Sequence, residues 1–334
     1  MTEVSGVPAA VRGVAERFLR DAAEVDGSGQ LPGEHLRLLA EAGLYGIFAP
    51  PELGGLGLDF PGICSAVEEL ASGCLASTFV WIQHLRLLGA MLDDSTPAPL
   101  RDRLLPGVVR GEVRGGVALA GLLPGPPRLT AQPVPGGWRL DGQSPWVTGW
   151  GHISVVVAIA RGPGDSVVTL LVEAGERPGL TAERQRLAAV DASATVRLGF
   201  DGLFVPAEHY LGQQPFDPVR QQSEGLRLNG SLALGVGRRC CALIGPSALD
   251  EELRDRRTEL DQASTEAMSA ARARASEFAV RAAHALAVHH GSASALAGDD
   301  AERLTREAAF LLVFGSRPAI NAALFQQFSM GESG

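Results

Sequence analysis

The sequence predicts an α+β protein in which a β-rich central domain separates two helical domains. Apolar residues recur at helical spacing from about residue 9 to residue 105, and again after residue 212. Between these regions, short apolar and β-branched runs are punctuated by Gly and Pro. We therefore expect an N-terminal helical domain, a central antiparallel β-barrel domain and a C-terminal helical bundle, over residues 1–111, 112–213 and 214–334.

The N-terminal region has the pattern of amphipathic helices. Val11, Val14 and Phe18 recur at the spacing that places side chains on one face of a helix. The Pro- and Gly-rich stretch over residues 50–58 predicts a loop. Further helices are expected over residues 33–44, 61–73 and 77–92.

The central region reads as a succession of short strands. Turn-forming pairs such as Gly-Pro and Asp-Gly separate its apolar runs, a spacing that is typical of a small antiparallel barrel or sandwich. The expected strands cover residues 113–120, 129–134, 138–140, 155–159, 167–172, 196–200 and 203–205. Helices are expected to resume over residues 228–243, 249–260, 263–288 and 302–327.

Composition and charge narrow the class of protein. The formal net charge of −9 argues against nonspecific nucleic-acid binding. Cys64, Cys74, Cys240 and Cys241 lack the spacing of a zinc site, so we interpret them as reduced, mostly buried thiols. The first residues lack a signal-peptide pattern, and no apolar run reaches the roughly 18 residues that span a bilayer. We expect a cytoplasmic protein with no metal site, no nucleic-acid partner and no membrane attachment.

A Trp-x-Thr pattern interrupts the central region at Trp146, Val147 and Thr148. On an extended strand, side chains alternate, so Trp146 and Thr148 are predicted to share one face. A flat indole beside a hydroxyl suits a planar heteroaromatic ring such as a flavin. The alternative is a buried Trp next to an ordinary strand Thr, with no ligand.

Five motifs in chain order resemble those of the acyl-CoA dehydrogenase flavoproteins. The loop that begins Pro51-Glu52 resembles an early Pro-Glu and Gly-Gly motif of that family, and the segment 137–148 resembles the strand that meets its flavin. The other matching segments are residues 67–71, 200–206 and 302–308. The order helices, barrel, helices is also that of the family, and the resemblance covers nearly the whole chain.

The resemblance implies that FAD binds between the barrel and the C-terminal helices, at a subunit interface. Trp146 and Val147 would then pack beside the flavin, and Thr148 would hydrogen-bond to its reactive region. It further implies acyl-CoA or another acyl thioester as substrate, a role in lipid metabolism, and assembly with a second copy or a related subunit. Small residues predict room for a bulky acyl group: Gly230, Ser231, Ala233 and Gly235.

The carboxylate base that this chemistry requires is the main departure from the pattern. Counting back from the helix that begins near Glu302 places the base at Gly298, and the other position that the resemblance suggests falls near Leu228. Neither is acidic. A shift of one residue makes Asp299 the candidate base, whereas the alternative gives Asp299 the role of helix N-cap. Glu224 is a further nearby acid, with a helix-start charge as its alternative role.

The residues expected to contact the cofactor elsewhere are also altered. Arg256 and Arg257 are candidates for the FAD pyrophosphate, because a guanidinium suits phosphate, with a salt-bridged helix face as the alternative. His289 and Gly291 stand where the family has a Gln and Gly motif near the flavin, with helix capping as the alternative.

Three functions follow from the resemblance. The first is α,β-desaturation of an acyl thioester with hydride transfer to FAD. The second is a non-catalytic or half-site subunit of a mixed acyl-CoA dehydrogenase oligomer, which the missing acid and altered motifs favour. The third is a flavin-dependent monooxygenase on the same fold, which needs no base for an α-proton.

Overall fold

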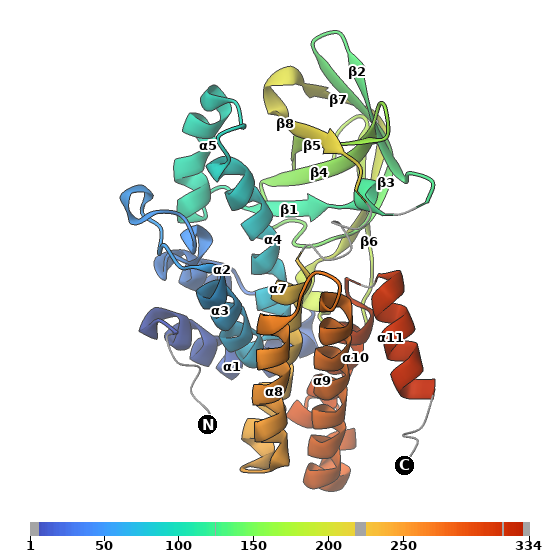
Figure 1. Ribbon diagram of the computed structural model, residues 1–334. Coiled ribbons are helices and arrows are strands. Elements are labelled where there is room, and N and C mark those ends of the chain that lie inside the picture. The colour runs from blue at the N-terminus through green and yellow to red at the C-terminus, as the bar shows by residue number, and fades with distance from the viewer. Residues whose placement is uncertain (1–6, 124, 218–224, 316, 330–334) are drawn as a thin grey trace.

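The computed structural model describes residues 7–123, 125–217, 225–315 and 317–329. Figure 1 shows N-terminal helices packed beside a sheet, and a set of long C-terminal helices that extends away from that sheet. The N-terminal helices are α1 (Ala9–Ser28), α2 (Gly33–Glu41), α3 (Phe60–Gly73), α4 (Leu75–Leu92) and α5 (Ala98–Arg110). The short 3-10 helices η1 (Leu44–Gly46) and η2 (Pro51–Leu53) connect α2 to α3.

The ends of the first helices have local causes in the sequence. Val11, Val14 and Phe18 lie on the buried face of α1, as their spacing predicts. That helix ends at Gly29, whose left-handed φ of 63° suits glycine. Helix α3 begins at Asp59, whose side chain accepts a hydrogen bond of 2.9 Å from the Gly62 N–H.

Helix α4 is the most apolar of the described helices that approach membrane-spanning length. By length and composition it is the one described helix apolar enough to cross a bilayer, but 72% of its 18-residue window is buried inside the protein. Trp81 on this helix is 1% exposed and donates a hydrogen bond to the Leu44 carbonyl. Helix α4 is therefore a core helix, around which the N-terminal region and the sheet pack.

One mixed sheet forms the central region. Its strands are β1 (Gly115–Ala118), β2 (Leu129–Val134), β3 (Gly137–Val147), β4 (Val155–Gly162), β5 (Ser166–Glu173), β6 (Leu180–Arg184), β7 (Val196–Pro206) and β8 (Tyr210–Pro215). They pair in the order β6-β7-β3-β2-β4-β5-β8, and β1 pairs with β4. The 3-10 helices η3 (Ala120–Leu122), η4 (Asp191–Ser193) and η5 (Ala207–His209) lie between strands.

The predicted antiparallel barrel is correct in fold class and wrong in detail. Among the described residues, the edge strands β6 and β8 do not pair with each other, so the sheet is not closed. The pairs β1–β4 and β2–β4 are parallel. Turn spacing in a sequence predicts neighbouring antiparallel strands, and it carries no information about which edges meet across the sheet.

Strand β4 shows how the sheet joins the helices. Val156 and Ala158 pack into the core inside the sheet, whereas Val155 and Val157 pack against residues of α4 and α5. Both faces of the strand are thus buried, which explains its uninterrupted apolar sequence.

The C-terminal helices pack closely through small residues. They are α7 (Leu226–Ile244), α8 (Ala248–Gln262), α9 (Met268–His290), α10 (Asp300–Val313) and α11 (Pro318–Ser329), with η6 (Gly291–Ala295) before α10. A Cβ atom at Gly235 would lie 2.6 Å from the Glu68 carbonyl, and one at Gly237 would lie 2.6 Å from the Phe278 ring. Glycine at these positions therefore permits the close approach of α7 to α3 and α9. All four cysteines are free and buried, as expected.

Candidate functional site

Trp146 and Thr148 lie at the end of β3, but they do not share one face as predicted. Trp146 is 58% exposed, whereas Thr148 is 1% exposed. The pairing of β3 with β7 is irregular between Ser144 and Val147, and Trp146 has a left-handed φ of 63°. A bulge with one left-handed residue interrupts the alternation of side chains, so the prediction of a shared face was wrong.

The Thr148 hydroxyl is already hydrogen-bonded within the protein. It lies 3.2 Å from the Thr195 hydroxyl, which lies 2.8 Å from the hydroxyl of Ser193. The Thr148 carbonyl is also close to β1, because a Cβ atom at Gly116 would lie 3.2 Å from it. Thr148 thus anchors the end of β3, while Val147 is fully buried in the core of the sheet.

Trp146 is one of several residues with a strained backbone near the C-terminal end of β3. Among the described residues, four non-glycine residues have positive φ, and three of them are Trp146, Val190 and Ala194. Left-handed backbone is unusual for a β-branched residue such as Val190. Val190 and Ala194 flank η4, which faces the end of β3: the Gly149 N–H donates to the Ser193 carbonyl at 2.8 Å. Such clusters of strain are found at functional sites.

The predicted phosphate ligands are engaged within the chain. Arg257 on α8 donates two hydrogen bonds to the carboxylate of Glu68 on α3, and Glu68 is 1% exposed. Arg256 forms an ion pair of 2.8 Å with Glu259, one turn further along α8. The structure therefore favours the salt-bridged alternative for both arginines.

The remaining candidates gather where α9 ends and α10 begins. His289 and Gly291 are both exposed, and Gly291 follows the last residue of α9 with a φ of 73°. Asp299 accepts a hydrogen bond of 2.8 Å from the Ala301 N–H and lies 3.2 Å from His290 Nδ1. This is the geometry of an N-cap, the alternative weighed for Asp299.

Asp299 is also distant from the other position suggested for the base. Helix α10 has 14 residues and is thus about 20 Å long. Asp299 lies at its start, whereas Gly315, just beyond its end, lies close to Asn229 beside Leu228: a Cβ at Gly315 would be 3.1 Å from the Asn229 amide. The candidates Asp299 and Leu228 therefore belong to opposite ends of the bundle. Glu224 lies outside the described residues.

The small residues predicted to leave room for an acyl group are packed. Ser231 and Ala233 are fully buried. A Cβ atom at Gly230 would lie 2.7 Å from Leu260, and one at Gly235 would lie 2.6 Å from Ala71. These residues allow close packing of the helices and leave no room for an acyl group. The prediction of such room was therefore wrong.

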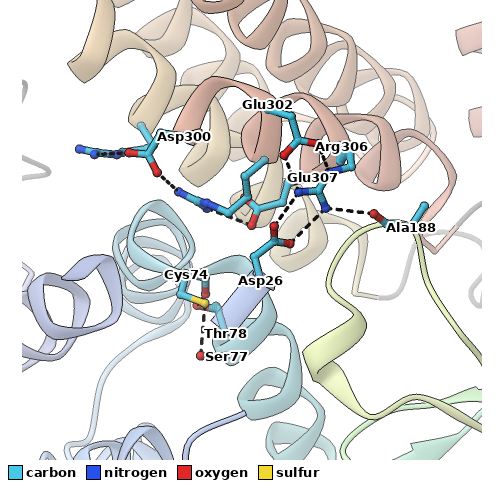
Figure 2. Close-up of polar contacts among 11 residues, drawn as sticks. Asp26, Cys74, Ser77, Thr78, Ala188, Asp300, Glu302, Arg306 and Glu307 are labelled. Carbon is cyan, nitrogen blue, oxygen red and sulfur yellow. Dashed lines mark hydrogen bonds and ion pairs between the residues drawn. The ribbon is translucent and has the colours of Figure 1, made fainter. Parts of the chain in front are cut away.

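A charged network that the sequence analysis did not identify joins three parts of the chain (Figure 2). Arg306 on α10 donates to both carboxylate oxygens of Asp26 on α1, at 3.1 and 2.6 Å, and to the Ala188 carbonyl at 3.0 Å. It also pairs with Glu302 one turn earlier. The signal was present in the i, i+4 spacing of Glu302 and Arg306, but Asp26 and Ala188 are distant in sequence.

A second, buried ion pair lies beside this network. Arg303 and Glu307 are each 3% exposed and are joined by a hydrogen bond of 3.0 Å. Burial raises the pKa of the Glu307 carboxyl above its usual range, although Arg303 opposes this. Arg303 also donates to Asp300, which in turn pairs with Arg239 on α7. The ion pair of Asp300 with Arg239 thus links α10 to α7.

A small pocket opens next to Arg306. It has a volume of about 230 Å³ and is lined by residues that include Asp26, Gly29, Arg186, Ala188, Asp191 and Arg306. Ligand pockets are mostly apolar with a few polar groups, whereas the lining of this pocket is largely polar and includes four charged side chains. We assign no ligand to it.

The described residues fit a flavin in part. The exposed indole of Trp146 offers the flat apolar surface that an isoalloxazine ring needs. The arginines expected to hold the phosphates are already paired with Glu68 and Glu259. The chain therefore exposes a flat aromatic side chain, whereas its predicted phosphate ligands are paired with its own carboxylates.

Comparison with known proteins gives a consistent result. The family described as "Acyl-CoA dehydrogenase, N-terminal domain" matches residues 3–112. Benzylmalonyl-CoA dehydrogenase of Aromatoleum aromaticum is 28% identical over 239 residues, 67% of this chain and 62% of that protein. Isovaleryl-CoA dehydrogenase of Arabidopsis thaliana is 29% identical over 53% of this chain and 46% of that protein. The matches thus span about half to three fifths of these two relatives.

Solved structures share the fold over nearly the whole chain. Butyryl-CoA dehydrogenase of Megasphaera elsdenii superimposes with a TM-score of 0.80 at 16% identity, over 97% of this chain and 98% of that chain. Dibenzothiophene monooxygenase of Paenibacillus sp. A11-2 gives 0.76 at 17% identity, over 96% of each chain. At such identities the likeness establishes the fold alone. Together with the matched N-terminal family and the curated relatives, the shared fold supports a relationship of this chain to the acyl-CoA dehydrogenase family.

Proposed function

We propose that this protein binds FAD beside Trp146, at the C-terminal end of β3, and acts in the α,β-desaturation of an acyl thioester. The observation that carries the proposal is the exposed indole of Trp146, held in a strained left-handed backbone beside the strained turn at Val190 and Ala194. A large exposed aromatic side chain in such a setting is more readily explained by a ligand than by the stability of the fold. Bound FAD would supply the acceptor for a hydride from the substrate.

Residues at the end of β3 would have separate roles in binding the flavin. Trp146 would stack on the flavin ring, and Val147 and Thr148 would fix the position of Trp146 from within the sheet. Because the Thr148 hydroxyl is bonded to Thr195, its first role is to anchor this segment. Because Asp299 is used as a helix cap, the α-proton would pass to water or to a carboxylate of a neighbouring subunit.

A second candidate is a half-site subunit of a mixed acyl-CoA dehydrogenase oligomer. Two observations favour it: Asp299 caps α10, and Arg257 is paired with the buried Glu68. In such an assembly, a related subunit would supply the base and the phosphate contacts. The monooxygenase alternative rests on the shared fold only.

The visible absorption spectrum of the purified protein tests these candidates. The chain is purified alone and after co-expression with a related acyl-CoA dehydrogenase subunit, and acyl-CoA is added without oxygen. Flavin in the lone chain, bleached by acyl-CoA, supports desaturation. A colourless lone chain that gains flavin only with the partner supports the half-site subunit. If neither preparation contains flavin, both proposals fail.

A further inference from the structure

The loop formed by residues 185–195 holds the end of β3 at four points. Its members donate or accept hydrogen bonds with each of Trp146, Thr148, Gly149 and Trp150. The bonds are Trp146 N–H to Gln185 Oε1 at 2.9 Å, Thr148 hydroxyl to Thr195 hydroxyl at 3.2 Å, Gly149 N–H to Ser193 carbonyl at 2.8 Å, and Trp150 N–H to Ala194 carbonyl at 3.1 Å. Three of these contacts fix residues around Trp146, and one reaches Trp146 itself.

The contact to Trp146 comes from the Gln185 side chain. Trp146 lies in the bulge, where a residue loses its regular partner on the neighbouring strand. Its N–H therefore needs another acceptor, which Gln185 Oε1 supplies. Left-handed backbone is unfavourable for a residue other than glycine. A hydrogen bond available only in that conformation offsets part of this cost.

Gln185 is itself held in place. Its backbone N–H donates to the Thr195 carbonyl at 3.0 Å, one residue beyond the last β6–β7 pair, Arg184 with Val196. The same Thr195 bonds the hydroxyl of Thr148. Trp146 and Thr148 are thus fixed from one side, by two neighbouring residues of the loop.

The loop is also tied to the helical regions. Arg306 donates to the Ala188 carbonyl in the middle of the loop while it pairs with Asp26 of α1 (Figure 2). Asp191 accepts a hydrogen bond from the Leu187 N–H at 2.9 Å, which fixes the turn between these points. The position of Gln185 therefore depends on the packing of α1, α10 and the sheet together.

We propose that Gln185 is a positioning residue for Trp146. Its side-chain oxygen holds the Trp146 backbone in the left-handed conformation, so that the indole is exposed at the end of β3. Without this acceptor, the backbone at residue 146 returns to an extended conformation. Alternation along the strand then turns the indole toward the side of Thr148 and Ser144, which are both buried. The inference rests on the proposed function only in taking the presented ring as a flavin platform.

The test compares Gln185→Leu, which removes the acceptor, with Gln185→Glu, which retains an acceptor oxygen. Both are made in the full chain with Trp138→Phe and Trp150→Phe. Because Trp81 is 1% exposed, acrylamide then quenches mainly the fluorescence of Trp146. FAD affinity is measured on the same proteins.

We expect Gln185→Leu to lower the quenching and to weaken FAD binding about tenfold. Gln185→Glu should restore both properties. Quenching in Gln185→Leu equal to that of the parent, or a Glu variant that behaves like the Leu variant, overturns the positioning role. If the parent binds no FAD, the proposed function fails, and the quenching result still decides the role of Gln185.

Discussion

Arg257 and Glu68 form a two-pronged ion pair between α8 and α3, with Nε–Oε2 and Nη2–Oε1 distances of 3.0 and 2.5 Å. The Arg257 side chain is 21% exposed and that of Glu68 is 1% exposed. A bidentate geometry satisfies both carboxylate oxygens and leaves the guanidinium little capacity for a phosphate. The pair therefore links the N-terminal and C-terminal helices and is not poised to bind a ligand.

The first prediction follows from the burial of Glu68. Arg257→Met should lower the free energy of unfolding by about 3–5 kcal/mol, because it leaves a buried carboxylate unpaired. The matched control is the double variant Glu68→Leu with Arg257→Met, which removes both charges and should recover most of the loss. Urea denaturation measures both. If Arg257→Met keeps wild-type stability and instead loses FAD, the arginine binds phosphate after all.

The second prediction separates the two roles of Asp299. Asn is as good an N-cap as Asp, whereas Ala removes the cap. Asp299→Ala should therefore cost about 1 kcal/mol in the free energy of unfolding, and Asp299→Asn should be close to wild type. Neither change should alter the bleaching of flavin by acyl-CoA. A stable Asp299→Asn protein that no longer bleaches would restore Asp299 as the base.

Contacts close in sequence could be predicted, and those made across the fold could not. The helical face of α1 and the capping alternative for Asp299 depend on residues a few positions apart, and the structure agrees with both. The bond from Trp146 to Gln185 spans 39 residues, and the pair of Arg257 with Glu68 spans 189. No local pattern contains such partners.

The prediction that Trp146 shares a strand face with Thr148 was wrong for the same reason, because the contact that decides it is distant in sequence. Strand periodicity assumes extended backbone at every residue, and Trp146 and Thr148 fit that pattern. The conformation of Trp146 is instead stabilised by the 185–195 loop, which follows three further strands, β4, β5 and β6. The resemblance to the acyl-CoA dehydrogenases was predictable because the motifs that carry it are short and local. The ion pair of Arg257 with Glu68 was not, because its partners are distant in sequence.

The third prediction concerns the effect of the strained backbone at Trp146 on the free energy of unfolding. Trp146→Gly removes the indole and suits a φ of 63°, so the free energy of unfolding should stay the same or rise by up to about 1 kcal/mol. FAD affinity should fall about tenfold or more, because aromatic stacking is lost. Trp146→Phe is the control, since it keeps a flat ring and the strain. Equal FAD affinity in the Gly variant would remove Trp146 from the flavin site.

The fourth prediction concerns pH and rests on His84, a buried residue of α4. His84 is 1% exposed, and its Nδ1 accepts a hydrogen bond of 3.2 Å from the Gly115 N–H. Its Nε2 has no hydrogen-bond partner, and the ring packs edge-on against Tyr45. Burial lowers the pKa of His84 from 6.5 to about 4; the backbone of Tyr45 and Val108 opposes this shift, and the positive charge of Arg114 adds to it.

The sign of the effect follows from proton uptake. Between pH 6.5 and pH 4 the unfolded chain protonates His84 and the folded protein does not, so stability falls as the pH falls through this window. The full loss of unfolding free energy is about 3 kcal/mol. At pH 7 His84 is neutral in both the folded and the unfolded state, so its protonation does not affect stability there.

His84→Asn, which retains an acceptor near Nδ1 and does not titrate, should show a shallower decline of stability with falling pH. Denaturant unfolding of both proteins at several pH values measures the difference. Parallel curves for the two proteins would show that another group, such as the buried His35, causes the decline.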